Sequence, residues 1–518
     1  LFGEPEHILI LNGEQADQPN RGASLTTADV NGDGHQDLFV VGGGEGVANT
    51  LLLGDGGSKF RPVEDHPLLH QTGVNAALWG DYDNDGLVDV YLLRKGPNQL
   101  WRQSEDGNWQ DVTAASGTGN GESDSRDGAM FDADHDGDLD ILLVNHDAPN
   151  ELLNNNLDGS FTPIAAERGI DGGSGEAHSL LLVDLENDRD TDIVILNAEP
   201  PHEIYVNELM WRYRPDDGFD SFLQTPVSAA VAGDNDGDGL PELFTLDDGG
   251  TLRKWRRDDD GTWSNLVPYT TDAAPDPQLE LQDFDGDGKD ELRIATAKGW
   301  EVLLLDDEAT GAIFAAAETG FGISLLRDVG RGPGIAVLDP DNTLGFLPPG
   351  SGRYPFLGLA LTGLDQQAES MRSNASGIGT RLAVRSGNRW TLTDTFRHHS
   401  GPGQSLQPLA VGLGGADQAD FVALTWSDGV YQTELGLAAG QLHRITETQR
   451  QLSSCPVLFA WDGERYAFVS DLLGVGGMGY FVDPGVYAPP RPWENFLFPP
   501  GLPQPQDGRL RMKIGEPM

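Results

Sequence analysis

The sequence predicts an all-β fold assembled from tandem repeats, and three observations support that prediction. An aspartate-rich nonapeptide occurs six times within the first 300 residues, and consecutive copies begin 49 to 52 residues apart. A short apolar run such as ILLV or IVIL follows each copy, which is typical of a buried strand. The chain also contains 68 glycines and 32 prolines, a composition that suits many turns and few helices.

The six nonapeptides share acidic or amide side chains at positions 1, 3 and 5 and a carboxylate at position 9. Five of them have glycine at position 6, which permits the left-handed turn of an ion-binding loop. The copies read DVNGDGHQD from Asp29, DYDNDGLVD from Asp81, DADHDGDLD from Asp132, DLENDRDTD from Asp184, DNDGDGLPE from Asp234 and DFDGDGKDE from Asp283.

This crowding of carboxylates is costly unless a cation neutralises it, because like charges a few ångströms apart repel. Side-chain oxygens at positions 1, 3, 5 and 9 and a carbonyl at position 7 suit Ca²⁺, which takes about six to eight oxygen ligands. Mg²⁺ requires a stricter octahedron. A helical EF-hand would place glutamate at position 12, whereas here the last acid stands at position 9 and a strand follows. Acidic turns that only solvate a surface are the alternative, and recurrence in register argues against it.

We therefore predict five to six Ca²⁺ ions. The fourth loop is expected to bind more weakly, because Glu186 stands at position 3 and Arg189 replaces the glycine. The predicted ligands, with the position-7 residue contributing its backbone carbonyl, are Asp29, Asn31, Asp33, His35 and Asp37; Asp81, Asp83, Asp85, Leu87 and Asp89; Asp132, Asp134, Asp136, Asp138 and Asp140; Asp184, Glu186, Asp188, Asp190 and Asp192; Asp234, Asp236, Asp238, Leu240 and Glu242; and Asp283, Asp285, Asp287, Lys289 and Glu291.

The segments between the loops predict the architecture. Segments such as NQLWRQSEDGNWQDVT are typical of hairpins. With the strands on either side of the ion loop, each repeat is predicted to contain four strands, the content of one propeller blade. A degenerate seventh copy, DVGRGPGIAVL from Asp328, lacks the later carboxylates and should hold no ion. The opening segment EHILILNG is expected to complete this seventh unit near Ile335–Leu347. We predict a seven-bladed β-propeller over residues 1–352; an open solenoid or another blade count is the alternative.

The repeats resemble the FG-GAP-like, or VCBS, family, whose members build integrin-type propellers with calcium in the blade loops. Further along, SNASGIGTRLAVRSG from Ser373, GQSLQPLAVGLG from Gly403 and TWSDG from Thr425 resemble the ASPIC/UnbV domain. That family commonly follows such propellers in secreted bacterial proteins and in cartilage acidic proteins. The resemblance implies a small β domain over residues 366–450 with adhesive or scaffold roles, and it supplies no catalytic residues.

A further β-rich segment is predicted over residues 453–518, where LFAW and RYAFV flank a DG turn. Gly474, Gly476 and Gly479 match a dinucleotide fingerprint, but the prolines that follow preclude its phosphate-binding helix. His398 and His399 have no acidic or cysteine partner at ligand spacing and are expected to be exposed to solvent.

The composition limits the classes of partner that the protein can bind. The chain carries 33 basic and 83 acidic residues, a net charge of −50, which repels nucleic acid and anionic membranes. Cations, basic proteins and neutral glycans remain as partners. Cys455 is the only cysteine, so no intrachain disulfide forms. The sequence contains no run of 18 apolar residues, so no membrane span is predicted. Because the chain starts at Leu1, we interpret it as a processed or trimmed product.

The function predicted from these features is an extracellular calcium-binding scaffold, secreted or on the cell surface, with the periplasm as an alternative location. It would act in adhesion, in protein or glycan binding, or in surface assembly. The sequence contains no G-x-S-x-G, H-E-x-x-H or P-loop motif. A calcium-dependent polysaccharide lyase or hydrolase on a propeller is the alternative, and it requires acid or base residues outside the six loops.

Overall fold

The structure is a computed structural model of the 518-residue chain. It describes residues 1–10, 24–42, 46–57, 59–172, 176–208, 211–257, 262–272, 274, 277–305, 310–317, 320–363, 373–429, 431–448, 457–463, 465–471, 481–483, 486–487, 498, 502–506 and 508–515. Cys455 and the glycine motif at Gly474, Gly476 and Gly479 lie outside these residues.

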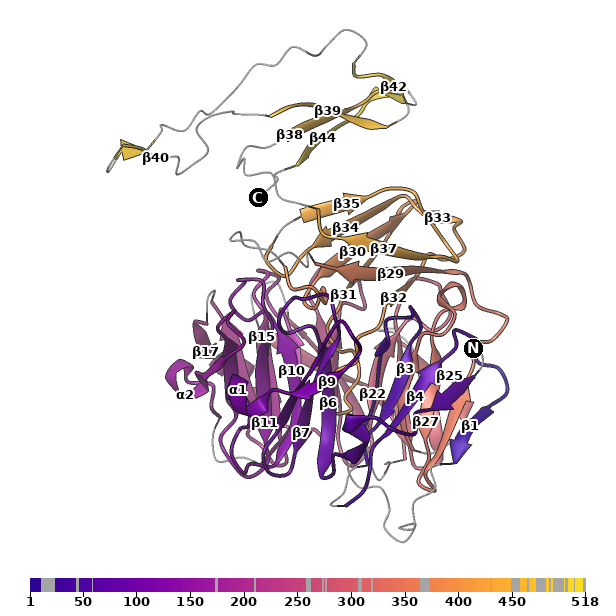
Figure 1. The fold of residues 1–518 in the computed structure, drawn as a ribbon. Coiled ribbons are helices and arrows are strands. Elements are labelled where there is room, and N and C mark those ends of the chain that lie inside the picture. The colour runs from indigo at the N-terminus through magenta and orange to yellow at the C-terminus, as the bar shows by residue number, and fades with distance from the viewer. Residues whose placement is uncertain are drawn as a thin grey trace.

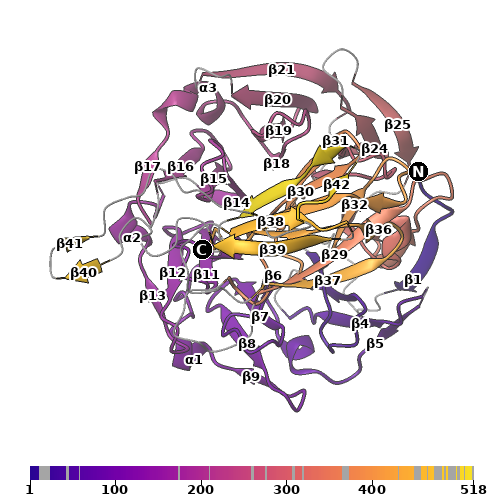
Figure 2. The same cartoon turned by 90° about the horizontal axis from the view of Figure 1, so that it is seen from above.

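Seven antiparallel sheets of four strands are formed by the described residues between 1 and 347, and they are arranged as a ring (Figure 2). In six of them the strands follow one another along the chain. These sheets are β2 (Leu25–Ala28), β3 (Asp37–Val40), β4 (Thr50–Gly54), β5 (Phe60–Pro62); β6 (Val74–Gly80), β7 (Asp89–Arg94), β8 (Gln99–Gln103), β9 (Trp109–Asp111); β10 (Ser125–Phe131), β11 (Asp140–Asn145), β12 (Glu151–Asn155), β13 (Phe161–Pro163); β14 (Ala177–Val183), β15 (Asp192–Asn197), β16 (Glu203–Asn207), β17 (Tyr213–Pro215); β18 (Ala229–Gly233), β19 (Glu242–Leu246), β20 (Thr251–Arg257), β21 (Trp263–Thr270); and β22 (Leu279–Gln282), β23 (Glu291–Thr296), β24 (Gly299–Leu304), β25 (Gly311–Ala316).

The remaining sheet of the ring joins the two ends of the repeat region. It contains β26 (Phe321–Leu325), β27 (Gly334–Leu338) and β28 (Thr343–Leu347), and β1 (Glu6–Ile10) pairs antiparallel with β28. The pairing of the opening segment with this part of the chain agrees with the expectation from the sequence. It covers the free edge that β28 would otherwise expose.

The second strand of each repeat is buried on both faces, because neighbouring sheets pack against it from either side. All six residues of β11 and of β15 are buried, which explains the continuous apolar runs after the nonapeptides. In one shared core, Leu78 and Leu93 pack with Leu142 and Val144 of the next sheet. Short helices lie between strands: η1 (Pro67–His70), α1 (Thr113–Ser116), α2 (Ala165–Arg168), η2 (Asp217–Phe219), α3 (Asp220–Leu223) and η3 (Val329–Arg331).

A second β module lies over one face of the ring (Figure 1). Its sheets are β32 (Leu409–Gly412), β29 (Phe356–Thr362) and β37 (Leu442–Thr446); β31 (Arg389–Asp394), β30 (Arg381–Ser386), β34 (Phe421–Thr425) and β35 (Tyr431–Glu434); and β33 (Gln418–Ala419) with β36 (Leu437–Ala438). Its core contains Leu382, Val384, Val422, Leu424 and Trp426.

Beyond this module the described residues form three small sheets. They are β39 (Tyr466–Asp471), β38 (Val457–Trp461) and β44 (Met512–Gly515); β40 (Phe481–Asp483) and β41 (Val486–Tyr487); and β42 (Pro505–Gln506) and β43 (Arg509–Leu510). The predicted hairpin of LFAW and RYAFV is present as β38 and β39. None of the helices in the described part of the chain is long and apolar enough to cross a membrane.

The module sends one loop, residues 397–407 between β31 and β32, into the ring. This central loop forms hydrogen bonds with the first strand of all seven ring sheets. The partners are Thr27 of β2, Ala77 and Trp79 of β6, Met130 of β10, Leu180 of β14, Ala232 of β18, Leu279 and Leu281 of β22, and Ser324 of β26. These seven strands are therefore the innermost strands, and the central loop occupies the middle of the ring.

Two side chains anchor the central loop. The Arg397 guanidinium donates to both oxygens of Asp127, at 2.7 Å each, and to the Leu180 carbonyl at 2.7 Å. The Gln404 amide accepts from the Met130 N–H at 2.8 Å and donates to the Met130 carbonyl at 3.2 Å. A side chain that satisfies buried backbone groups in this way fixes the loop in one register.

The expectation that His398 and His399 are exposed is wrong. His398 Nε2 lies 3.2 Å from Asp394 Oδ1, four residues earlier, and the His399 Nδ1 atom is buried. Burial alone would lower the pKa of His398, but the Asp394 carboxylate outweighs it and raises that pKa to about 9. Both residues belong to the central loop, whose surroundings come from strands far away in the sequence.

Candidate metal centres

Each nonapeptide is the loop between an innermost strand and the second strand of its sheet. In the second copy, Asp81 closes the loop: Oδ1 accepts the N–H of Asp85 at 3.1 Å and Oδ2 accepts that of Gly86 at 2.7 Å. Gly86 has φ of +86°, in the left-handed region that favours glycine. A bond from the position-6 N–H to the position-1 carboxylate occurs in all six loops.

Four of the loops gather three carboxylates whose oxygen atoms all lie within 4.8 Å of one another. These groups are Asp81, Asp83 and Asp85; Asp132, Asp134 and Asp136; Asp234, Asp236 and Glu242; and Asp283, Asp285 and Glu291. Within the described residues, the first and fourth loops form no such group. The first loop has the amide of Asn31 at position 3, and this amide donates to Asp33 at 3.0 Å.

Position 9 has two different roles that the sequence did not distinguish. Where it is aspartate, both carboxylate oxygens accept backbone N–H groups: Asp140 binds Ala133 at 3.0 Å and Asn155 of β12 at 2.9 Å. Asp37, Asp89 and Asp192 do the same. Position-9 aspartate therefore ties the loop to the third strand of its sheet.

Where position 9 is glutamate, the longer side chain leaves one oxygen for the carboxylate group. Glu291 Oε2 accepts the N–H of Phe284 at 2.8 Å, whereas its Oε1 atom is buried without a hydrogen-bond partner. Glu242 Oε2 accepts from Asn235 at 2.9 Å, and its Oε1 lies 3.1 Å from Lys254 Nζ. This difference explains why the groups of the fifth and sixth loops include position 9.

The electrostatics of these groups fit a bound cation. Asp83 Oδ1, Asp134 Oδ1 and Glu291 Oε1 are buried acceptors without a partner, which is costly unless something positive faces them. Burial, together with neighbouring carboxylates, raises the pKa of Asp81 to about 7 and that of Glu291 to about 9. All-oxygen donors with several carboxylates are the set that Ca²⁺ prefers.

Asp138 is a carboxylate whose side chain was not predicted to matter. It stands at position 7 of the third loop, is only 1% exposed, and both of its oxygens lack a partner. Burial and the carboxylates of Asp140, Asp136 and Asp132 raise its pKa to about 11. The third loop therefore concentrates five carboxylates, the largest local excess of negative charge among the six loops.

Basic side chains already compensate some of the loops. Arg102 of β8 pairs with Asp83, and its Nη2 lies 2.8 Å from Asp85 Oδ2 in the second loop. In the fifth loop, Lys254 forms an ion pair with Glu242. In the described part of the chain, no lysine or arginine forms an ion pair with a carboxylate of the third or sixth loop. The third loop, with five carboxylates, therefore has the greatest need for an added cation, whereas the positive charge of Arg353 acts on Asp283, Asp285 and Glu291 of the sixth loop without a direct ion pair.

In the fourth loop, the arginine that replaces glycine adopts the left-handed conformation. Arg189 has φ of +84° at the position that is glycine elsewhere, a conformation that is rare for a residue with a side chain. Arg381 of β30, from the second module, forms an ion pair with Asp184. A guanidinium therefore already stands on the position-1 carboxylate of this loop.

Two families match the chain. The FG-GAP-like repeat matches residues 29–92, 81–143 and 132–195, each match running from one nonapeptide into the next, and ASPIC and UnbV matches residues 370–452. The chain carries FG-GAP-like repeats and an ASPIC/UnbV domain.

Cartilage acidic protein 1 of Homo sapiens is 23% identical over 255 residues, which cover 44% of this chain and 38% of that protein. The protein of the same name from Xenopus tropicalis is 27% identical over 171 residues, which cover 30% and 26%. The alignments thus span less than two-fifths of these relatives. Among solved structures, the BP39L lectin of Burkholderia pseudomallei matches with a TM-score of 0.44 at 13% identity, over 65% of this chain and 98% of that one. A BBS1N–ARL6DN complex matches with a TM-score of 0.45 at 10% identity, over 68% and 97%.

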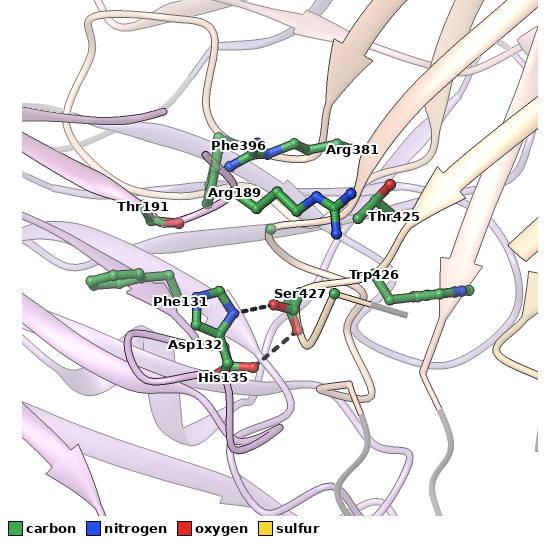
Figure 3. A pocket seen from close by; sticks show the side chains of 12 residues that line it. Phe131, Asp132, His135, Arg189, Thr191, Arg381, Phe396, Thr425, Trp426 and Ser427 are labelled. Atoms are coloured by element: carbon green, nitrogen blue, oxygen red, sulfur yellow. Dashed lines mark hydrogen bonds between the residues drawn. The ribbon is translucent and has the colours of Figure 1, made fainter. Parts of the chain in front are cut away.

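The ASPIC/UnbV domain rests on the candidate metal loops. In the second loop, Asn84 Oδ1 accepts the N–H of Ala375 at 2.7 Å, and the Asp81 N–H donates to Ser376 Oγ at 2.8 Å. In the third loop, the Ser427 hydroxyl donates to Asp132 Oδ2 at 3.0 Å (Figure 3). In the third loop the position-1 carboxylate therefore both closes the loop and holds the domain, whereas the second loop holds it through the Asp81 N–H and the Asn84 side chain.

The remaining contacts follow the same pattern. His135 of the third loop bridges the Ser427 carbonyl at 2.5 Å and the Asp190 carboxylate of the fourth loop at 2.9 Å. At the sixth loop, the Thr391 hydroxyl donates to the Gly288 carbonyl at 2.9 Å. Gly412 of β32 lies so close that an added Cβ would stand 2.0 Å from Asp283 Oδ2. The position and shape of these loops thus determine where the ASPIC/UnbV domain sits.

Proposed function

We propose that this chain is an extracellular calcium-binding scaffold without catalysis, acting in adhesion, in protein or glycan binding, or in surface assembly. In this proposal, residues 1–352 are a closed seven-bladed propeller, residues 366–450 are the ASPIC/UnbV domain, and residues 453–518 are a further β-rich segment. The seven four-stranded sheets and the pairing of β1 with β28 support the blade count.

One observation carries the calcium proposal: buried carboxylate oxygens without partners lie inside the groups formed by the nonapeptides, at Asp83, Asp134 and Glu291. Bound Ca²⁺ would supply the positive charge that these oxygens lack. The extracellular location follows from calcium supply, because sites with Kd near about 10⁻⁴–10⁻³ M fill outside cells.

The loops are not equivalent in this proposal. The third and sixth loops, whose carboxylates form no ion pair with lysine or arginine in the described residues, bind most tightly. The second and fifth loops bind next, because Arg102 and Lys254 compete with the ion. The first loop contributes fewer carboxylates, and in the fourth loop the guanidinium of Arg381 takes the place of the ion. This assigns five ions, the lower of the two numbers expected from the sequence.

Calcium and shape are linked through the ASPIC/UnbV domain. Because the domain binds Asn84, Asp132 and Gly288 of three metal loops, the loops must keep their shape for the domain to stay in place. A ligand that binds only the folded state stabilises it by mass action, by about 2.7 kcal/mol per site at a free concentration of a hundred times Kd.

Differential scanning calorimetry tests the proposal. The protein is scanned in 2 mM calcium, in excess chelator, and in chelator with excess magnesium, at about the same ionic strength. We expect the chelated protein to unfold several degrees lower and magnesium to restore little of the loss, because Mg²⁺ prefers a stricter octahedron. Identical melting curves in calcium and chelator would refute calcium binding by the loops.

A further inference from the structure

A cavity of about 460 Å³ opens between the ASPIC/UnbV domain and the fourth and fifth loops of the ring. One wall is the face of the sheet β31–β30–β34–β35 that points toward the ring, and the other wall includes Asp184, Arg189 and Asp234. This volume lies in the range of roughly 300–1,000 Å³ that small-molecule sites occupy. None of the functions assigned to the calcium loops uses this space.

The register of the sheet determines the shape of this cavity wall. Residues directly opposite one another on antiparallel strands share a face. Three rows result: Trp390, Arg385 and Phe421; Leu392, Ala383, Ala423 and Thr433; and Asp394, Arg381, Thr425 and Tyr431. The small side chains of Ala383 and Ala423 stand in the middle row, so the wall is hollow at its centre, with Trp390 and Tyr431 at diagonally opposite corners.

The two aromatic side chains that flank the hollow are unusually exposed. Trp390 is 50% and Tyr431 48% exposed, whereas Leu382 and Leu424 on the opposite face of the same sheet are buried in the domain core. Phe421 supports Trp390 from the side, with ring centroids 6.0 Å apart at 77°. An aromatic ring held in place by its neighbours and open to a cavity is a surface on which a ligand ring can stack.

The charged groups around the hollow are largely paired with one another. Arg381 pairs with Asp184, His398 lies 3.2 Å from Asp394, and Arg397 binds Asp127. Most of the charge around the hollow is therefore already neutralised within the protein. A neutral ligand with many hydroxyl groups can add hydrogen bonds to charged donors and acceptors, which are stronger than bonds between neutral groups.

Arg189 supplies further donors. Its side chain points toward Thr425 of the ASPIC/UnbV domain (Figure 3), and no ion pair of this guanidinium is formed within the described residues. A guanidinium presents five N–H donors and no acceptor. It therefore suits the oxygen atoms of a polyhydroxylated ligand.

We propose that this cavity binds a neutral oligosaccharide, with one sugar ring stacked on Trp390, another on Tyr431, and hydroxyl groups bound to Arg189 and Asp394. The apolar face of a sugar ring can stack on an aromatic side chain, and its hydroxyl groups can form hydrogen bonds with the charged groups of the wall. This proposal rests on the scaffold function proposed above and names one class of partner for it. It does not require an ion in the fourth loop, which forms part of the wall.

The test is a printed array of neutral and charged oligosaccharides, probed with the calcium-loaded full chain. The strongest neutral binder is then titrated into wild-type protein and into Trp390→Ala and Tyr431→Ala by calorimetry. We expect saturable binding of a neutral oligosaccharide and a loss of about tenfold in affinity for each variant, since a stacked aromatic contributes on this scale. Tyr354→Ala is the matched control, because Tyr354 is equally exposed but does not line the cavity.

The proposal is overturned if no neutral oligosaccharide on the array binds, if only charged ones bind, or if both cavity variants bind like wild type. Each variant must first melt within a degree or two of wild type in calcium. Scanning calorimetry with chelator separates the two proposals. If the protein binds saccharide but melts at the same temperature with and without calcium, only the calcium proposal is refuted. If calcium raises the melting temperature but no saccharide binds, only the cavity proposal is refuted.

Discussion

Arg397 and Asp127 form an ion pair in the middle of the ring, although 270 residues separate them in the sequence. Both carboxylate oxygens accept from the guanidinium, and the two side chains are 10% and 0% exposed. The pair joins the ASPIC/UnbV domain to β10, so the domain and the ring depend on each other for the satisfaction of buried charges.

Removing this cation should destabilise the whole molecule. Arg397→Met leaves Asp127 buried and unpaired, which costs about 3–5 kcal/mol in the free energy of unfolding. Urea unfolding followed by tryptophan fluorescence measures the change. Arg465→Met is the control, because Arg465 is 84% exposed, lies 3.9 Å from Asp462, and should change stability little. Equal stability of the two variants would contradict an anchoring role for the central loop.

The fourth loop should acquire an ion when its internal cations are removed. In the double variant Arg189→Gly and Arg381→Met, the position-6 residue no longer needs a strained φ and Asp184 loses its guanidinium partner. Native mass spectrometry in calcium should then find one more bound ion than in wild type. Arg385→Met, on the same strand but without an ion pair to the loops among the described residues, should leave the number of ions unchanged. An unchanged number in the double variant would show that Arg381 does not occupy the ion position.

Matched alanine substitutions should rank the loops. Asp285→Ala removes a carboxylate from the group of the sixth loop, whereas Asp188→Ala acts in the fourth loop, which forms no such group in the described residues. The rise in melting temperature that calcium causes should shrink in Asp285→Ala and stay close to wild type in Asp188→Ala. The opposite order would refute the ranking.

The stability of the calcium-free protein should depend on pH in a defined direction. Burial, together with nearby carboxylates, raises the pKa of Asp132 to about 7, of Asp283 to about 8 and of Glu291 to about 9, from about 4 in an unfolded chain. The folded state therefore holds these protons more tightly, and the stability that they provide is lost as pH rises through 7 to 9. Calorimetry in chelator should show the melting temperature falling from pH 6 to pH 9. A rise in melting temperature over that interval would mean that the protein stabilises the ionised carboxylates without bound calcium.

The repeat and the loops could be predicted from the sequence because both are local. Nine residues contain the carboxylates of a loop, and the glycine at position 6 adopts the left-handed conformation at Gly34, Gly86, Gly137, Gly239 and Gly288. The pairing of the opening segment with the last repeat was predictable from its strand-like pattern, since an incomplete sheet needs a fourth strand.

What could not be predicted depends on partners far away in the sequence. Arg381 meets Asp184 across 197 positions, and nothing in the pattern around either residue indicates it. Asp394 lies only four residues before His398, but without the central loop there was no reason to expect this pair to be partly buried. The separate roles of aspartate and glutamate at position 9 also depended on which backbone N–H groups lie within reach.

An anomalous difference map from crystals grown in saturating calcium tests the central claim most directly. Ions should appear among the carboxylates of the first, second, third, fifth and sixth loops. In the fourth loop, the Arg381 guanidinium and no ion should contact Asp184. Absence of any peak beside Asp134 in the third loop and Glu291 in the sixth would contradict the account, because each of these carboxylates has a buried oxygen without a hydrogen-bond partner.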